Sequence, residues 1–238
     1  MKILSIDTSS NVCSVAILED NKVIKEITNE DGNTHSVKLM PQIEQIFKET
    51  NLNLQDIDLF ACDKGPGSFT GIRIGISTIK AFSDVYATKS IGICSLMALA
   101  YNSDFNGYIC SLIDAKNNNV YFSLFDNTNG KHEKISEYCC KNINSVTEIL
   151  KVCNKEVFFV GNGSIVYKDV LESTLKENAI FTSDDKLNKL NATNLGIAAF
   201  EVLKNNLYSE EFNLSPLYLR PSNAERELEE KQNAKNSN

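Results

Sequence analysis

The sequence is poor in the residues that build most metal and nucleophile sites. It contains two histidines, His35 and His132, so neither an HExxH nor an HxxxH motif occurs, which excludes a histidine-based metal hydrolase. The GxSxG motif of a serine nucleophile is absent as well, although counting residues does not exclude a Ser-His-Asp triad. His35 lies between Thr34 and Ser36 near an expected helix start, which favours a surface or capping role.

The seven cysteines do not form a CxxC pair, and adjacent Cys139 and Cys140 lack the spacing of a zinc knuckle. We interpret them as buried or idle thiols of a reducing compartment.

Long hydrophobic runs and an excess of positive charge are also lacking. No apolar stretch has the length of a membrane span, and Asp7 arrives too early for a signal-peptide core, so we expect a cytoplasmic protein. The net charge of −7 and the pI near 5.0 give no basic footprint for nucleic acid. If the chain acts on nucleic acid, another component is expected to hold it.

What is present is an α/β pattern that occurs twice in 238 residues. Strand, turn and strand are predicted over 2–18, with Asp7 at the turn, and the same order returns over 107–127 with Asp114. The second turn is expected to be one residue longer. Two halves that begin alike indicate a duplicated α/β unit.

Helices are predicted over 36–50, 68–85, 96–101, 165–175 and 194–204. In the first, Val37, Met40, Ile43 and Phe47 share one face, and Pro41 is expected to kink or delay the start. Ser145 and Glu148 have capping-box spacing before a further short helix.

The most unusual stretch is GPGSFTGIRIG at 65–75. Gly71 is followed by Ile72 and Arg73 instead of lysine and a hydroxyl, so it is not a Walker loop. A dinucleotide fold would need an acidic residue after the next strand, which SIGICSL lacks. Packing is the favoured reading, because Gly67, Gly71 and Gly75 form a stripe without side chains. Spacing leaves open whether the stripe meets the same domain or another subunit.

Asp7 and Asp114 fit a two-lobed ATPase, in which an aspartate-bearing turn of each lobe faces the phosphates. Such turns normally carry glycine, whereas these read TSSN and AKNNN. Capping of a tight turn explains both aspartates equally well. We therefore treat four residues as candidates for a degraded nucleotide site: Asp7, Asp114, Gly161 and Gly163.

The stretch GPGSFTGIRIG closely resembles the signature of the TsaB (YeaZ) family, the accessory subunit of the bacterial tRNA threonylcarbamoyladenosine machinery. Further segments agree in order over about residues 1–225, although the family usually has an arginine and a glutamate where this chain reads KNNN. These segments are ILSIDTSSNVCSVAIL, THSVKLMPQIEQIF, IDAKNNNVYFSLF and SPLYLRPSNAE.

The resemblance implies a two-lobed actin-like ATPase fold (ASKHA, duplicated ribonuclease H-like) with a reduced second lobe. It implies a non-catalytic subunit without a resident cofactor, with ATP or ADP and magnesium conceivable only at a subunit boundary. The partners it implies are the catalytic sibling TsaD, the ATPase TsaE in the assembled complex, a second copy when alone, and tRNA only through the complex. The alternative is a small-molecule kinase or ATPase of the same fold.

The resemblance also implies pairing through the first two helices of the first lobe. The interface residues expected there are His35, Leu39, Ile43, Phe47, Gly67, Ser68, Thr70, Gly71, Arg73 and Gly75. We expect a first lobe over 1–104, a second over 105–221 and a polar, disordered tail over 222–238.

Overall fold

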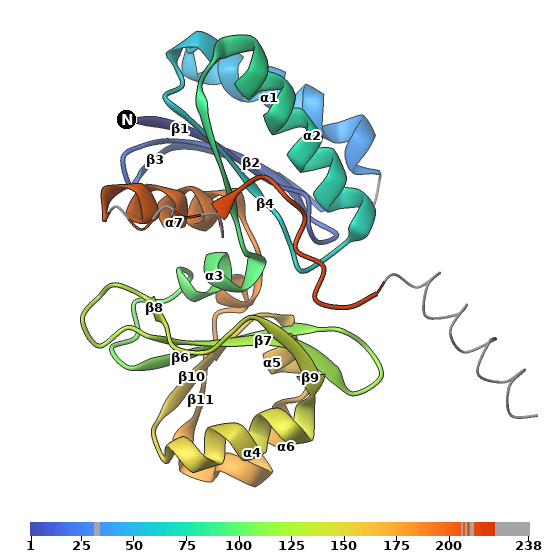
Figure 1. Cartoon of the computed structure of the whole chain (residues 1–238), viewed down its shortest axis with the longest axis vertical. Helices are drawn as coiled ribbons and strands as arrows, with labels where there is room; N and C mark the ends of the chain where they lie inside the picture. The colour runs from blue at the N-terminus through green and yellow to red at the C-terminus, as the bar shows by residue number, and fades with distance from the viewer. Residues whose placement is uncertain (31–33, 206, 208, 210–211, 222–238) are drawn as a thin grey trace, which may run out of the picture.

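The computed structural model describes residues 1–30, 34–205, 207, 209 and 212–221. Figure 1 shows two lobes stacked along the long axis, each built on one sheet. The first sheet has the strand order β3-β2-β1-β4-β5, and the second has β11-β10-β6-β7-β8 with β9 also paired to β7. Read in the direction β8-β7-β6-β10-β11, the second sheet has the same strand order as β3-β2-β1-β4-β5 of the first. This agreement confirms the expected duplication of one α/β unit.

The first lobe alternates strands and helices in the way that the sequence pattern predicts. Its elements are β1 (Lys2–Asp7), β2 (Cys13–Glu19), β3 (Lys22–Asn29), α1 (His35–Thr50), η1 (Leu54–Asp56), β4 (Leu59–Asp63), α2 (Phe69–Tyr86) and β5 (Lys89–Ile93).

The second lobe and the connections to it follow. Their elements are α3 (Ser95–Ala100), β6 (Tyr108–Asp114), β7 (Asn119–Asp126), β8 (Glu133–Lys134), β9 (Cys139–Asn142), α4 (Ile143–Cys153), β10 (Val157–Val160), α5 (Asn162–Val166), α6 (Lys168–Leu175), η2 (Lys176–Asn178), β11 (Ala179–Phe181), η3 (Asp185–Asn188) and α7 (Ala192–Lys204).

Alternation along the strands divides the core of the first lobe. Leu4 and Ile6 of β1 pack with α1 and α2, whereas Ile3 belongs to the cluster beneath the sheet, where α7 lies. That lower cluster also includes Ile109 and Phe125 of the second sheet, so the two lobes share one apolar core. In Figure 1, α7 and α3 lie between the two sheets.

The lobe boundary differs from the predicted one. α7 falls within the range assigned to the second lobe, 105–221, yet it packs on β1, β2 and β4 of the first sheet. Residues 212–221 also return to the first lobe, where the Leu217 amide donates to the Lys64 carbonyl oxygen (2.7 Å). The predicted tail, 222–238, lies outside the described residues.

Local predictions also differ from the structure. The β1–β2 connection spans 8–12 and the β6–β7 connection 115–118, so the second turn is shorter, not longer. Pro41 does not delay α1, which begins at His35, while the alternative of a kinked first turn stays a prediction. Ser145 lies inside α4, whose N-cap is Asn142: its side chain accepts a hydrogen bond from the Asn144 amide (3.0 Å).

Candidate functional site

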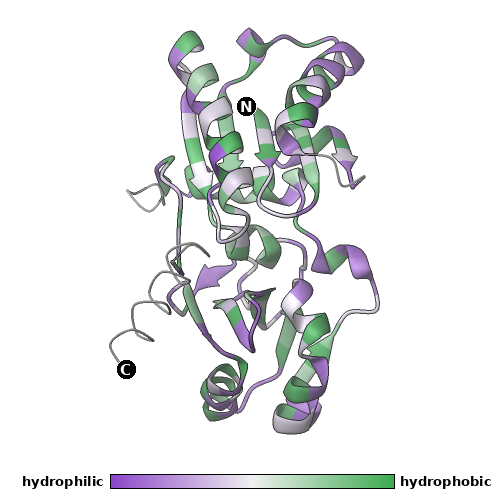
Figure 2. Cartoon of the chain, turned by 90° about the vertical axis from the view of Figure 1, so that its right-hand side faces the viewer, coloured by the Kyte–Doolittle hydropathy of each residue, from purple (hydrophilic) through white to green (hydrophobic). Residues whose placement is uncertain are grey.

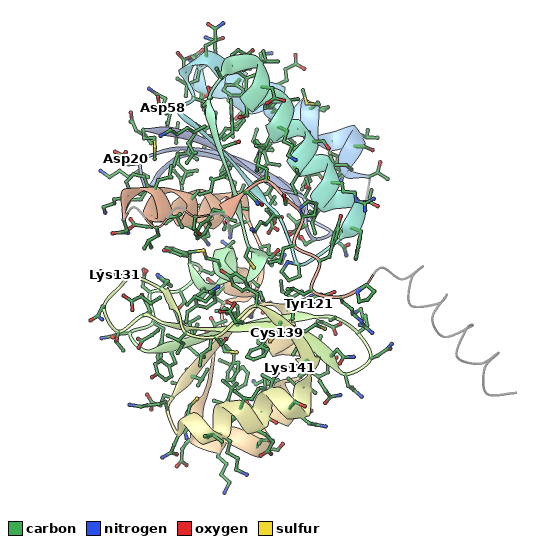
Figure 3. The ribbon with its side chains drawn as sticks, viewed as in Figure 1. Asp20, Asp58, Tyr121, Lys131, Cys139 and Lys141 are labelled. Atoms are coloured by element: carbon green, nitrogen blue, oxygen red, sulfur yellow. The ribbon has the colours of Figure 1, made fainter. Side chains whose placement is uncertain are left out.

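A cleft of about 880 Å³ separates the lobes on the side where the β1–β2 and β6–β7 turns face each other. Ser9–Val12 and the start of α2 form its first-lobe wall. On the second-lobe side it is lined by Asp114, Lys116 and Tyr121, and Tyr121 is labelled between the lobes in Figure 3. Clefts between domains are a common place for small-ligand sites.

Residues 212–221 run from the first lobe toward the second, as the red segment of Figure 1 shows, and Arg220 and Pro221 at its end line the cleft. We call this segment the strap. Its Tyr218 stacks on Phe69 at the start of α2, with ring centroids 4.3 Å apart, and accepts a hydrogen bond from Arg73 Nε (2.8 Å). Arg220 donates from Nη1 to the Ala115 carbonyl oxygen in the second lobe. The strap therefore touches both lobes.

Among the described residues, four basic side chains line the cleft, and two of them have an acidic partner. Within the described ranges Arg73 and Arg220 form no ion pair, whereas Lys116 pairs with Asp114 and Lys189 with Glu30. The cleft therefore offers two guanidinium groups to an anion, with the hydroxyl of Ser68 at the start of α2.

Asp7 lies behind the cleft wall, and its side chain does not reach the cleft. It is fully buried, and its Oδ1 accepts hydrogen bonds from the Ser9 amide (2.8 Å) and from Ser9 Oγ (2.7 Å). Its Oδ2 is buried and has no hydrogen-bond partner in the part of the chain that the structure describes. A nucleotide in the cleft would meet Ser9 before it met this carboxyl group.

A second buried carboxyl group, Asp63, lies beside Asp7. Its Oδ2 is 3.1 Å from the same Ser9 Oγ, and its Oδ1 accepts from Ser95 Oγ (2.7 Å) and the Gly65 amide (2.6 Å). Burial raises the pKa of Asp63 well above its usual range, and the charge of Asp7 adds to the rise. Burial also raises the pKa of Asp7, against the hydrogen bonds of Ser9, which lower it.

Asp114 occupies the position in the second lobe that Asp7 has in the first, but its environment differs. It lines the cleft and pairs with Lys116 Nζ at 2.7 Å. Burial acts to raise its pKa, but hydrogen bonds from Lys116 and Tyr167 outweigh burial and hold the pKa below its usual range. Its charge is already compensated within the chain.

Gly161 and Gly163 have a packing role. A Cβ atom at Gly161 would lie 2.2 Å from the Leu112 carbonyl oxygen, and one at Gly163 would lie 2.9 Å from Leu112 Cβ. The Gly161 amide donates to Asn188 Oδ1 (3.0 Å), so it is not free for a phosphate. The predicted nucleotide set is therefore not assembled: Asp7 is closed off, Asp114 is paired and both glycines pack on β6.

A magnesium-bound nucleotide would need at least one carboxylate that is open to the cleft, since Mg²⁺ is held by one or two carboxylates together with waters and phosphates. No group of three or more His, Cys, Asp or Glu side chains suited to a metal ion occurs among the residues that the structure describes. Asp7 and Asp114, the two carboxylates predicted for such a site, are engaged as described above.

The glycine stripe meets the same chain. Cβ atoms at Gly67 and Gly71 would lie 2.3 Å from the Ser9 carbonyl oxygen and 1.8 Å from that of Thr8. At Gly75 the nearest atom would be Thr8 Oγ1, at 2.7 Å. The stripe thus seats the β1–β2 turn on α2, so these glycines pack within the chain, and the hypothesis that they belong to or lie beside a pairing interface stays a prediction.

The predicted face of α1 is also corrected. Leu39 and Ile43 are buried in the core, Phe47 is half-buried, and His35 Nε2 is 2.7 Å from the Ser10 carbonyl oxygen. The outward face instead carries Val37 and Met40, which are 67% and 52% exposed.

Of the predicted interface residues on α2 and before it, three remain accessible. Thr70 and Arg73 are exposed on α2, and Ser68 is its exposed N-cap, which accepts from the Gly71 amide (3.2 Å). In Figure 2, hydrophobic and hydrophilic positions are mixed along the helices of the first lobe.

Sequence reasoning missed Asp63, Tyr218 and Arg220. Asp63 could have been found, because it ends a buried strand directly before the glycine loop, and the carboxyl ends of neighbouring parallel strands meet. Nothing in the sequence alone indicates that Tyr218 and Arg220 reach the cleft, since their partners lie about 100 or more positions away.

The fold is that of the actin-like ATPases. A solved structure of YeaZ from Pseudomonas aeruginosa superposes with a TM-score of 0.72 at 20% identity, covering 92% of this chain and 99% of that one. A ROK hexokinase from Thermus thermophilus superposes with a TM-score of 0.53 at 8% identity, covering 86% of this chain and 100% of that one. None of the helices in the described ranges is long and apolar enough to cross a membrane.

The comparisons of sequence identify the family to which the chain belongs. The model of the TsaD family, described as tRNA N6-adenosine threonylcarbamoyltransferase, matches residues 22–228. The tRNA threonylcarbamoyladenosine biosynthesis protein TsaB of Bacillus subtilis is 31% identical over 176 residues, 74% of this chain and 77% of that protein. With the hairpin, the glycine loop and the strap in their expected order, the chain belongs to the TsaB (YeaZ) family.

Proposed function

We propose that this protein is the non-catalytic subunit of the complex that transfers threonylcarbamoyl from threonylcarbamoyl-AMP to the exocyclic amine of the adenosine beside the tRNA anticodon. The observation that carries the proposal is the family match, which runs through both lobes and includes a relative named for this pathway. In this proposal catalysis belongs to TsaD, TsaE joins the assembled complex, and tRNA is reached only through it. Alone, the chain forms a homodimer.

The outward face of α1 and α2 is the proposed pairing surface. Val37 and Met40 expose apolar side chains on α1, and Thr70 and Arg73 are exposed on α2. The first turns of the two helices lie together, since a Cβ at Gly71 would be 3.1 Å from His35 Cδ2. An apolar centre with a polar border is the usual composition of such a surface.

The substitution Met40→Glu tests this surface. A carboxylate there would have to be desolvated on pairing, so we expect binding to TsaD and self-association to weaken by about tenfold or more. The matched control is Val152→Glu on α4 of the second lobe, where the parent side chain is 85% exposed. Light scattering and titration calorimetry measure pairing, and formation of threonylcarbamoyladenosine on tRNA is measured with each component omitted in turn.

Two results would contradict the proposal. Transfer by TsaD that is unaffected by omission of this chain would remove its role in the complex. Equal pairing by the Met40→Glu and Val152→Glu chains would place the interface elsewhere.

The alternative of a kinase or ATPase needs a carboxylate that is open to the cleft, and the geometry of Asp7 and Asp114 does not favour it. ATP turnover by the isolated chain, measured as release of phosphate, would make that alternative the leading one.

A further inference from the structure

The two connections between the lobes are held together by one side chain. The outward connection runs through α3 and 101–107, and the return connection runs through 182–191 into α7. Asn102, in the outward connection, is buried. Its Nδ2 donates to two carbonyl oxygens of the return connection, those of Leu187 (2.8 Å) and Lys189 (2.9 Å).

The oxygen of the same amide is also used. Asn102 Oδ1 accepts from Asn194 Nδ2 in the first turn of α7, and Asn191 Nδ2 lies 3.5 Å away. A primary amide has two N–H donors and one oxygen with two lone pairs, so Asn102 has a partner for each. Substitution by a shorter side chain, or by a carboxylate, would take away the donor of both carbonyl oxygens.

The return connection is fixed to both lobes as well. Asn188 Oδ1 accepts from the Gly161 amide (3.0 Å) and Ser164 Oγ (3.1 Å) in the second lobe. Four residues later, Ala192 is bonded to the first sheet: its amide donates to Ser14 Oγ and its carbonyl oxygen accepts from Ser5 Oγ, both at 2.6 Å. Few residues lie between these two sets of hydrogen bonds, so the return connection has little room for the changes of backbone dihedral angles that a hinge motion of the lobes would need.

Apolar packing also opposes motion between the lobes. Ile3 and Leu18 of the first sheet, Leu99 of α3, and Ile109 and Phe125 of the second sheet belong to one buried cluster. A hinge requires a connection that can change its dihedral angles without separating packed surfaces. Opening the lobes here would expose this shared core and break the amide contacts together.

We propose that the two lobes form one rigid body, locked by Asn102, and that the cleft keeps one width whether or not a ligand is present. The chain then presents both lobes to a partner as a single preformed surface, in contrast to a kinase that closes around its substrate. The proposal does not depend on the reaction in which the complex takes part.

The distance between the lobes in the chain that retains Asn102 can be measured first by pulsed electron–electron double resonance. Spin labels would replace Val85 on α2 and Val152 on α4, which are both strongly exposed. They would be attached through unnatural amino acids, because native cysteines would compete, and diluted with unlabelled chain so that only intramolecular distances are read. We expect one narrow distance distribution, unchanged by magnesium and ATP. A broad or two-peaked distribution, or a shift on adding ATP, would overturn the proposal.

Asn102→Ala then tests the lock itself. We expect a broader distance distribution and about tenfold faster amide exchange over 182–192, since the hydrogen bonds that close this connection are lost. Asn106→Ala is the matched control, because Asn106 is an exposed asparagine of the same outward connection. If Asn102→Ala does not fold, Asn102→Asp keeps the shape and removes both donors. An Asn102 variant that matches Asn106→Ala in both measurements would refute the lock.

Discussion

Ser9 has a single hydroxyl proton, yet its oxygen lies within hydrogen-bond distance of two buried carboxyl groups, Asp7 and Asp63. The hydroxyl can donate to one carboxylate only, so we expect the other carboxyl group to carry a proton of its own. Asp63 is the natural holder, because burial and the charge of Asp7 both raise its pKa. The chain of donors then runs from Asp63 through Ser9 to Asp7.

The free energy of unfolding should therefore depend on the protonation of Asp63. The folded state keeps this proton at pH values where the unfolded chain, with a pKa of about 3.9, has released it. The contribution of this proton to the free energy of unfolding is fully present below the pKa of the unfolded chain. Above that pH it decreases by about 1.4 kcal/mol per pH unit until the pKa of the folded state is reached. An asparagine at position 63 donates a hydrogen bond but does not titrate. We therefore expect Asp63→Asn to remove this dependence of the free energy of unfolding on pH and to be more stable than the parent chain at high pH.

Urea unfolding at a series of pH values measures this effect. Asp114→Asn is the matched control, because its lowered pKa contributes stability that is lost as the pH falls, the opposite sign. Parallel pH profiles for the parent and Asp63→Asn would show that Asp63 does not hold the proton.

At the scale of elements, α2 and the β1–β2 turn approach each other so closely that only glycine fits. Two hydrogen bonds also hold the pair: Ser68 N donates to the Ser9 carbonyl oxygen (2.7 Å), and Thr8 Oγ1 donates to the Gly71 carbonyl oxygen (2.8 Å). From α1, His35 Nε2 contacts the Ser10 carbonyl oxygen of the same turn. Turn, glycine loop and helix therefore form one unit, which shapes the first-lobe wall of the cleft.

We expect Gly71→Ala to lower the free energy of unfolding by about 3 kcal/mol, because its Cβ would collide with a backbone oxygen that cannot rotate away. Gly75→Ala should cost about 1 kcal/mol or less, since it meets the Thr8 hydroxyl and alanine favours the helix. Urea denaturation of the two variants compares them directly. Equal stabilities would mean that the turn can withdraw from α2.

On α1, helical periodicity alone does not decide which face of the helix is buried. The helix carries two overlapping apolar stripes, one with Val37 and Met40 and one with Leu39 and Ile46, and Ile43 fits both. Both satisfy helical spacing. The sheet selects the second stripe because β2 and the helix lie against each other with that side inward.

At the scale of the whole molecule, the strap ties the end of the described chain back to both lobes. Phe212 begins it and is buried in the shared core, and Asn213 packs its carbonyl oxygen against Gly92. This arrangement places an aromatic anchor in the apolar cluster to which both lobes contribute.

Phe212→Ala should accordingly lower the free energy of unfolding by about 3 kcal/mol through the cavity that it leaves in the shared core. Leu207→Ala, a few residues earlier and exposed, should change it by less than about 0.5 kcal/mol. Thermal or urea unfolding separates the two. A Phe212→Ala chain as stable as Leu207→Ala would show that the strap is not anchored in the core.

The sequence by itself determined the repeated strand-turn-strand units, the helix over 36–50 and the family, because periodicity and a continuous motif are local properties of the chain. It could not decide which face of α1 is buried, that Asp63 joins Asp7, or that α7 returns to the first sheet. Those outcomes depend on contacts between residues far apart in sequence, such as Ser5 with Ala192. Packing of α1, α2 and α7 on the first sheet brings such groups together, and the seating of the β1–β2 turn on α2 directs the glycine stripe inward.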